Sequence, residues 1–234
     1  MCFERRCKLH HNGPSNYKLG LLLDFDGTVT ENDIGNLIVS RFAIPGWESA
    51  YESFQRGEIL ARELWESQIG HLVQERELYS VNYALQEAQI RPGLNELVQF
   101  CESYDIPVEI VSSGLGYYVE ALLLHFGLGN RLSVVCPTLT YDSYGHGVIN
   151  VGIDFKECGY TALCKCDRAW RLRRQGREAI FVGDGLSDYC VSFQADHLLA
   201  TGDLAKYCDS HRRPYTPFVD FQDVLAYVQR LVVS

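Results

Sequence analysis

The feature that most constrains this chain is a short apolar run that ends in two carboxylates, Leu19-Gly20-Leu21-Leu22-Leu23-Asp24-Phe25-Asp26-Gly27-Thr28. The run is too short to cross a membrane and has the composition of a buried parallel strand. Side chains alternate along a strand, so Asp24 and Asp26 are expected on one side and Phe25 on the other. Two neighbouring acids repel each other and lose hydration, so a hard divalent cation such as Mg²⁺ is expected to compensate them. Taken alone, the stretch is equally compatible with such a site and with a plain strand that is followed by an acidic turn.

Two later apolar segments also end in polar clusters that contain glycine. Ile106–Val111 leads into Ser112-Ser113-Gly114, and Ala179–Val182 leads into Gly183-Asp184-Gly185-Leu186-Ser187-Asp188. Predicted strands and helices alternate here, which indicates a parallel sheet with right-handed crossovers. Ligands collect at the carboxyl ends of such strands, so the three clusters are expected to meet in one crevice. The other main elements that we predict are helices over 94–104, 117–126, 161–175 and 221–233, strands over 132–136 and 197–200, and a hairpin with arms 138–142 and 147–151.

A different pattern fills the stretch from Asp33 to Ile90, where apolar residues recur at helical spacing and hardly any β-rich run occurs. Arg91-Pro92-Gly93 ends this block, because proline does not continue a helix. We therefore predict an α/β fold: a Rossmann-like parallel-sheet core with an inserted small α-helical cap domain. The expected boundaries are 1–17 for a flexible N-terminal arm, 18–33 and 92–234 for the core, and 34–91 for the cap.

Composition and charge narrow the class of partner. The 234 residues contain no apolar run of membrane-spanning length, so no membrane partner is expected. The formal net charge of −9 argues against nucleic acid, since duplex-binding proteins usually present a basic face. A monomer and a homodimer are both compatible with the sequence.

Nine scattered cysteines indicate a reducing compartment, and hence a cytoplasmic protein. Cys101, Cys136 and Cys190 lie in apolar contexts and are predicted to be small core residues. Cys158, Cys164 and Cys166 are closer together, but no second cysteine or histidine pair completes a zinc pattern, so a metal site there is the less favoured alternative.

Four motifs in order carry a family resemblance: Asp-x-Asp-Gly-Thr at residues 24–28, Ser112 after a later strand, Lys165 on a helix, and Gly-Asp-Gly-x-x-Asp at residues 183–188. Together they resemble the haloacid-dehalogenase-type (HAD) phosphatases over about residues 18–234. A helical insert between the first two motifs is the layout of the subgroup that contains phosphoserine phosphatase. The segments Cys164-Lys165-Cys166 and Pro214-Tyr215-Thr216-Pro217-Phe218 look like those of the methionine-salvage phosphatases, which act on 2-hydroxy-3-keto-5-methylthiopentenyl 1-phosphate.

The resemblance implies a Mg²⁺-dependent phosphoric monoester hydrolase that acts on a small phosphorylated metabolite. It implies that Asp24 attacks phosphorus to form an aspartyl-phosphate and that Asp26 is the general acid and base. The metal-site residues that it implies are Asp24 through its carboxylate, Asp26 through its main-chain carbonyl, Asp184 through its carboxylate, and Asp188 beside them.

The substrate-binding residues that the resemblance implies are Ser112, Ser113, Gly114 and Lys165 for the phosphate, and Asp33 at the start of the cap. Some of these residues have alternative interpretations, which the sequence leaves open. Ser112 would otherwise cap the following helix, and Asp188 would otherwise be an acid at a helix start. Lys156 is the alternative to Lys165.

Three other functions stay open at this point: a phosphoserine phosphatase, a related phosphotransferase, and a sensor that binds a phosphorylated metabolite without turnover. The arginine that phosphoserine phosphatases place in the insert to hold the serine carboxylate is not evident here. Four residues of the insert are predicted to be packing or solvent-facing residues rather than ligands: Arg56, Arg62, Trp47 and Trp65.

Overall fold

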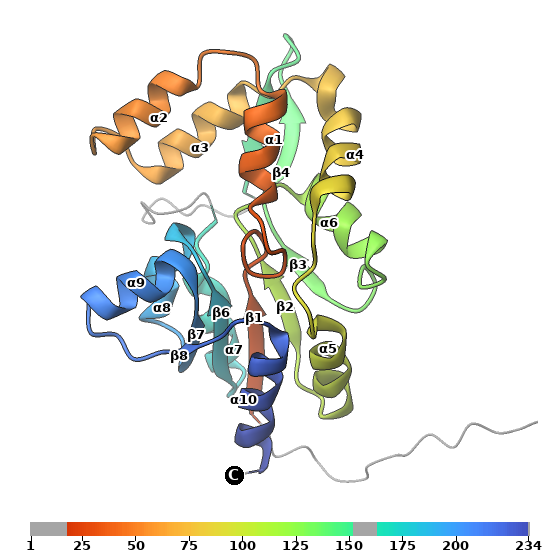
Figure 1. Cartoon of the computed structure of the whole chain (residues 1–234), viewed down its shortest axis with the longest axis vertical. Coiled ribbons are helices and arrows are strands. Elements are labelled where there is room, and N and C mark those ends of the chain that lie inside the picture. The colour runs from red at the N-terminus through yellow and green to blue at the C-terminus, as the bar shows by residue number, and fades with distance from the viewer. Residues whose placement is uncertain (1–17, 152–162, 234) are drawn as a thin grey trace, which may run out of the picture.

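The computed structural model describes residues 18–151 and 163–233, and its centre is a six-stranded sheet (Figure 1). The predicted arm over 1–17, Lys156 and Cys158 lie outside the described residues. Every pair of neighbouring strands in the sheet is parallel. In spatial order the strands are β3 (Ser133–Val135), β2 (Val108–Val111), β1 (Leu19–Leu23), β6 (Glu178–Gly183), β7 (His197–Ala200) and β8 (Thr216–Pro217).

Strand β1 lies in the middle of the sheet, and all five of its residues are buried. After β1 the chain adds β2 and β3 on one side, and then adds β6, β7 and β8 on the other. The strand order therefore reverses at β1, and the carboxyl ends of β1, β2 and β6 meet at the point where α/β sheets bind ligands.

Helices cover both faces of the sheet. Side chains alternate along each strand, so the apolar residues of β1 pack against helices on both sides. Leu21 and Leu23 belong to an apolar cluster with α5 (Leu94–Ser103), α6 (Gly116–His125) and α10 (Phe221–Val233). Leu22 belongs to a second cluster with α7 (Cys166–Arg174), α8 (Tyr189–Ser192) and α9 (Gly202–Ser210). Burial on both faces explains why the core strands are continuous apolar runs.

The helix predicted over 161–175 is wrong at its start, since Leu163, Cys164 and Lys165 are not helical and α7 begins at Cys166. The physical reason is tertiary: Lys165 reaches back to the carboxyl end of β1, and this contact fixes the turn before the helix.

Between β1 and α5 the chain forms four α-helices, which lie beyond the carboxyl ends of the strands (Figure 1). They are α1 (Ile34–Phe42), α2 (Glu48–Gln55), α3 (Ala61–Gly70) and α4 (Glu77–Glu87). An antiparallel bridge between Thr30 and Ile90 joins the two ends of this insert. The predicted fold class, a parallel-sheet core with an inserted helical domain, is confirmed. The predicted domain boundaries, 18–33 and 92–234 for the core and 34–91 for the cap, stay predictions.

The predicted hairpin is also present, as β4 (Thr138–Tyr141) paired with β5 (Gly147–Asn150). Its tip binds the insert, which the sequence did not indicate. The Gly147 N–H donates to the Leu72 carbonyl at 2.8 Å, and the Gln74 N–H donates to the Gly145 carbonyl at 3.1 Å. The hairpin therefore fixes the end of α3 relative to the sheet.

In the two described ranges, none of the helices has both the length and the apolar character that crossing a bilayer requires.

Candidate active site

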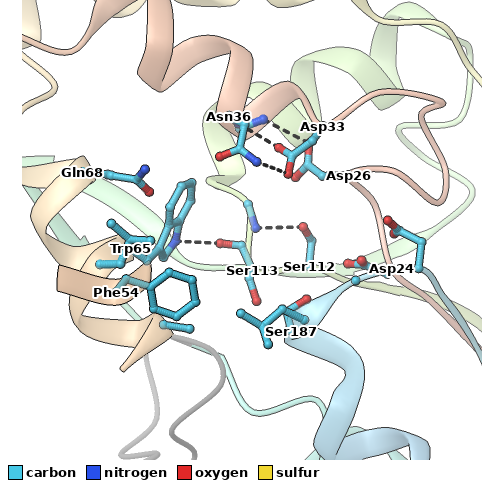
Figure 2. Close-up of a pocket in the computed structure, with 17 residues that line it drawn as sticks. Asp24, Asp26, Asp33, Asn36, Phe54, Trp65, Gln68, Ser112, Ser113 and Ser187 are labelled. Carbon is cyan, nitrogen blue, oxygen red and sulfur yellow. Dashed lines mark hydrogen bonds between the residues drawn. The ribbon is translucent and has the colours of Figure 1, made fainter. Parts of the chain in front are cut away.

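The three polar clusters expected to converge do meet, around a pocket of about 220 Å³ between the sheet and the insert (Figure 2). The core side of the pocket is lined by residues that follow β1, β2 and β6, and the insert side by residues of α1, α2 and α3 and by the residue before α1. The core contributes Asp24, Asp26, Ser112, Ser113, Gly114, Asp184, Gly185, Leu186 and Ser187, and the insert contributes Asp33, Gly35, Asn36, Phe54, Ala61, Leu64, Trp65 and Gln68.

Three carboxylates form a cluster at the base of this pocket. Each of Asp24, Asp184 and Asp188 contributes one oxygen, and these oxygens lie within 4.8 Å of one another. The Thr28 hydroxyl donates to Asp184 Oδ1 at 2.7 Å. Loss of hydration, followed by repulsion from Asp188, raises the pKa of Asp184 to about 6. The cluster thus carries more negative charge than its surroundings compensate, and its hard oxygen donors suit Mg²⁺.

Lys165 is the cation that faces this cluster, and its side chain is fully buried. Its Nζ lies 2.5 Å from Asp24 Oδ1, 2.6 Å from Asp188 Oδ1 and 3.0 Å from Ser187 Oγ. Burial acts to lower the pKa of Lys165, but the charges of Asp188 and Asp24 outweigh it and raise the pKa above its ordinary value. The structure therefore places a permanently charged Lys165 against the proposed nucleophile.

Asp188 does more than begin a helix. Its Oδ2 accepts the backbone N–H groups of Asp184 at 3.0 Å and Gly185 at 3.2 Å. These bonds hold the turn that directs Asp184 into the cluster. A direct role for Asp188 as a metal ligand stays a prediction.

Asp26 lies in a different environment from Asp24. Its Oδ1 accepts the backbone N–H groups of Ile34 at 3.0 Å and Gly35 at 3.3 Å, and its Oδ2 accepts the Tyr118 hydroxyl at 2.7 Å. Loss of hydration and the charge of Asp33 raise the pKa of Asp26 to about 7. Asp26 can therefore hold or release a proton near neutral pH. Its side chain is not part of the carboxylate cluster, and metal binding through its main-chain carbonyl stays a prediction.

The turn after β2 closes the core side of the pocket. Ser112 is buried, and its Oγ accepts the Gly114 N–H at 2.9 Å. Helix α6 is capped at Leu115 without a side-chain hydrogen bond, so Ser112 does not cap it. A Cβ atom at Gly114 would overlap the Tyr118 hydroxyl and the Asp26 carboxylate, so a larger residue here would displace these two groups.

On the insert side, Asp33 lines the pocket and also caps α1, where its Oδ1 accepts the Asn36 N–H at 2.7 Å. Trp65, predicted to be a packing or solvent-facing residue, packs against the apolar core and also lines the pocket. Its Nε1 donates to the Ser113 carbonyl at 3.0 Å (Figure 2).

The prediction that Arg56 and Arg62 are not ligands agrees with their positions. Arg56 pairs with Glu58 and Arg62 pairs with Glu66, each at 2.7 Å, and neither arginine lines the pocket.

The chain that forms this pocket matches the sequence profile of a known protein family. The profile of the haloacid dehalogenase-like hydrolases matches residues 21–192. The chain belongs to this family. The HAD resemblance predicted from the four motifs is thereby confirmed.

Full-length relatives and solved structures agree with the family assignment. A protein of Geobacillus thermodenitrificans (strain NG80-2), named 2-hydroxy-3-keto-5-methylthiopentenyl-1-phosphate phosphatase, is 31% identical over 92% of this chain and 98% of its own length. A protein of the same name from Exiguobacterium sibiricum is 29% identical over 89% and 95%. A solved phospho-aspartyl intermediate analogue of phosphoserine phosphatase superposes with a TM-score of 0.65 over 90% of this chain and 99% of that chain. Because the two sequences are only 17% identical, this superposition shows a shared fold and nothing about activity.

Sequence reasoning missed several residues of this HAD site. Thr28 and Ser187 stand inside the quoted motifs, so their positions were visible but their partners, Asp184 and Lys165, were not. No motif pointed to Tyr118, because its bond to Asp26 arises from the packing of α6 beside β1.

Proposed function

We propose that this chain is a Mg²⁺-dependent phosphatase whose substrate is 2-hydroxy-3-keto-5-methylthiopentenyl 1-phosphate. The enzyme class predicted from the sequence, a phosphoric monoester hydrolase, is confirmed by the family match and by relatives that are named as phosphatases. The observation that carries the mechanism is the pair of acids at the end of β1. Asp24 is held by Lys165 beside a carboxylate cluster, and Asp26 has a pKa of about 7 in the same pocket.

In the proposed reaction, an Asp24 oxygen attacks phosphorus and forms an aspartyl-phosphate as the ester oxygen leaves. Asp26 donates its proton to that leaving oxygen. The resulting carboxylate then takes a proton from water, whose oxygen attacks the phosphorus and releases inorganic phosphate and Asp24. Lys165 and the Ser112 hydroxyl, whose oxygen accepts the Gly114 N–H and whose own proton can still be donated, offset the charge of the phosphoryl oxygens.

The charge of the site supports a cation requirement. Asp24 and Asp184 line the pocket, and Asp188 is fully buried beside them. Lys165 alone cannot balance these three carboxylates and an incoming phosphate dianion. The Asp24 and Asp184 carboxylates would hold Mg²⁺, with Asp188 next to them. When bound, the ion supplies positive charge to the transferring phosphoryl group.

The insert side of the pocket supports the choice of substrate. Phe54, Leu64 and Trp65 give it an apolar wall, and among the described residues that line the pocket there is no arginine, lysine or histidine. A substrate carboxylate would lose hydration there without gaining a charged partner. A neutral methylthio end suits this wall, whereas phosphoserine carries a carboxylate, so the phosphoserine alternative is disfavoured.

The test is steady-state release of phosphate from a panel that includes the methylthiopentenyl phosphate, phosphoserine and p-nitrophenyl phosphate, with Mg²⁺ or with EDTA. We expect the highest kcat/KM for the first compound, loss of activity in EDTA, and no turnover by Asp24→Asn. Full activity of Asp24→Asn rejects the mechanism. Binding of the compounds without phosphate release indicates the sensor alternative, and new esters formed with added alcohols indicate a phosphotransferase.

A further inference from the structure

A second cluster of side chains lies outside the pocket and has no part in the proposed reaction. The sulfur atoms of Cys164, Cys166 and Cys190 lie within 4.8 Å of one another. Cys166 is buried, and Cys164 and Cys190 are half-buried. Cys190, predicted to be a small core residue, packs against the second apolar cluster without being fully buried. The three sulfurs come from two packed segments: the turn and first residue of α7, and helix α8.

Three converging cysteine sulfurs are a donor set for a borderline or soft metal ion, in contrast to the oxygen cluster at the pocket. Zinc binds thiolates at about 2.3 Å in tetrahedral geometry, which separates two sulfurs by about 3.8 Å. The three sulfurs here need to approach one another by at most about 1 Å to meet that requirement. We propose that Cys164, Cys166 and Cys190 form a structural Zn²⁺ site, with the fourth position taken by water or another ligand.

The position of this site gives it a consequence for the pocket. Lys165 stands between two of the proposed ligands, and Cys190 follows Asp188 by two residues. The Lys165 Nζ lies 2.6 Å from Asp188 Oδ1. A zinc ion would therefore tie the turn that carries Lys165 to the segment that carries Asp188. This link limits the conformations of the turn, so less conformational entropy is lost when Lys165 is held in its site.

The test measures zinc directly and does not depend on phosphatase activity. The full chain is expressed with zinc supplied and purified under reducing conditions, and its metal content is measured by mass spectrometry. We expect near-equimolar zinc in the unaltered chain, and at least a tenfold loss in Cys164→Ser and Cys190→Ser. Cys136→Ser is the matched control, because Cys136 is half-buried outside the cluster, and it should retain zinc. Cobalt in place of zinc should give thiolate-to-metal charge-transfer absorption that both cluster variants lack.

A second measurement covers the case in which these variants fail to fold. In the unaltered chain, alkylation of Cys164 and Cys190 should accelerate several-fold when a chelator removes zinc, while Cys136 should not change. Zinc removal in saturating Mg²⁺ should also lower turnover of p-nitrophenyl phosphate several-fold, and added zinc should restore it. Absence of zinc from the unaltered chain, zinc retention by both variants, or a disulfide within the cluster would overturn the site. Unchanged turnover after zinc removal would overturn its positioning effect.

Discussion

At the scale of single residues, two aspartates separated by one phenylalanine receive different chemistry from their surroundings. The Asp24 carboxylate accepts a hydrogen bond from the buried Lys165 ammonium group, which favours the ionised form, although loss of hydration and the charge of Asp188 hold its pKa above the ordinary value. Asp26 accepts two backbone N–H groups and a tyrosine hydroxyl, yet loss of hydration and the charge of Asp33 keep its pKa near 7. The cation beside Asp24 suits a nucleophile, and a proton held on Asp26 near neutral pH suits a general acid.

The Tyr118 hydroxyl should set the alkaline limit of activity. Asp26 must be protonated to serve as the acid, so kcat/KM should fall as pH rises above about 7. The Tyr118 bond stabilises the ionised form and lowers the pKa of Asp26, so Tyr118→Phe should move this limb to higher pH by about one unit. Tyr117→Phe is the control, since the Tyr117 hydroxyl faces Ser80 at 3.1 Å instead. Identical pH–rate profiles for Tyr118→Phe and the unaltered chain would contradict the assignment of Asp26.

Removing the Lys165 charge should cost stability as well as activity. Lys165→Met keeps the length of the side chain but leaves Asp24 and Asp188 buried without their cation. Breaking such a pair by removing one partner typically costs about 3–5 kcal/mol. Urea unfolding in EDTA should show this loss. Lys206→Met removes an exposed lysine paired with Asp203 and should leave the free energy of unfolding nearly unchanged. Equal effects of the two variants would count against the buried pairing.

At the scale of elements, the sequence predicted those strands and helices whose residues show a local hydrophobic pattern. The run before Asp24 identified β1, and helical spacing identified the insert. It did not predict β8, since the two residues Thr216–Pro217 are too short to show alternation. It also placed the start of α7 too early, because the turn before Cys166 is set by the contacts of Lys165. The hairpin was recognised, but its docking on the insert was not, since that contact joins segments about 70 residues apart.

Docking of the hairpin on α3 should depend on Gly147. A Cβ atom there would overlap the Ile69 carbonyl, which is backbone and cannot rotate away. Gly147→Ala should therefore lower the free energy of unfolding by about 1–3 kcal/mol. Gly70→Ala is a matched control at the same contact, since a Cβ at Gly70 meets nothing within 4 Å and alanine favours a helix. Chemical denaturation of both variants tests this, and equal stability would show that the hairpin does not pack on the insert as described.

At the scale of the whole molecule, the pocket is built from segments that are distant in sequence and brought together by the reversal of strand order at β1. Each segment contributes acids, so folding concentrates negative charge in one place: Asp24, Asp26, Asp33 and Asp184 all line the pocket. The fold therefore holds these carboxylates at an electrostatic cost, which a bound cation would relieve. Binding of the cation and stability of the fold should then be linked.

Magnesium should stabilise the folded chain in a pH-dependent way. A free Mg²⁺ concentration of 100 times Kd adds about 2.7 kcal/mol to the free energy of unfolding, which corresponds to a rise in Tm of about 5–10 °C for a chain of this size. Because the pKa of Asp184 is raised to about 6, protons compete with Mg²⁺ below that pH, so the rise in Tm should be full near pH 8 and small near pH 5. Thermal scans with Mg²⁺ and with EDTA at both pH values measure it. Asp184→Asn should remove the effect and the exposed Asp203→Asn should keep it; a rise in Tm that both variants share would place the cation elsewhere.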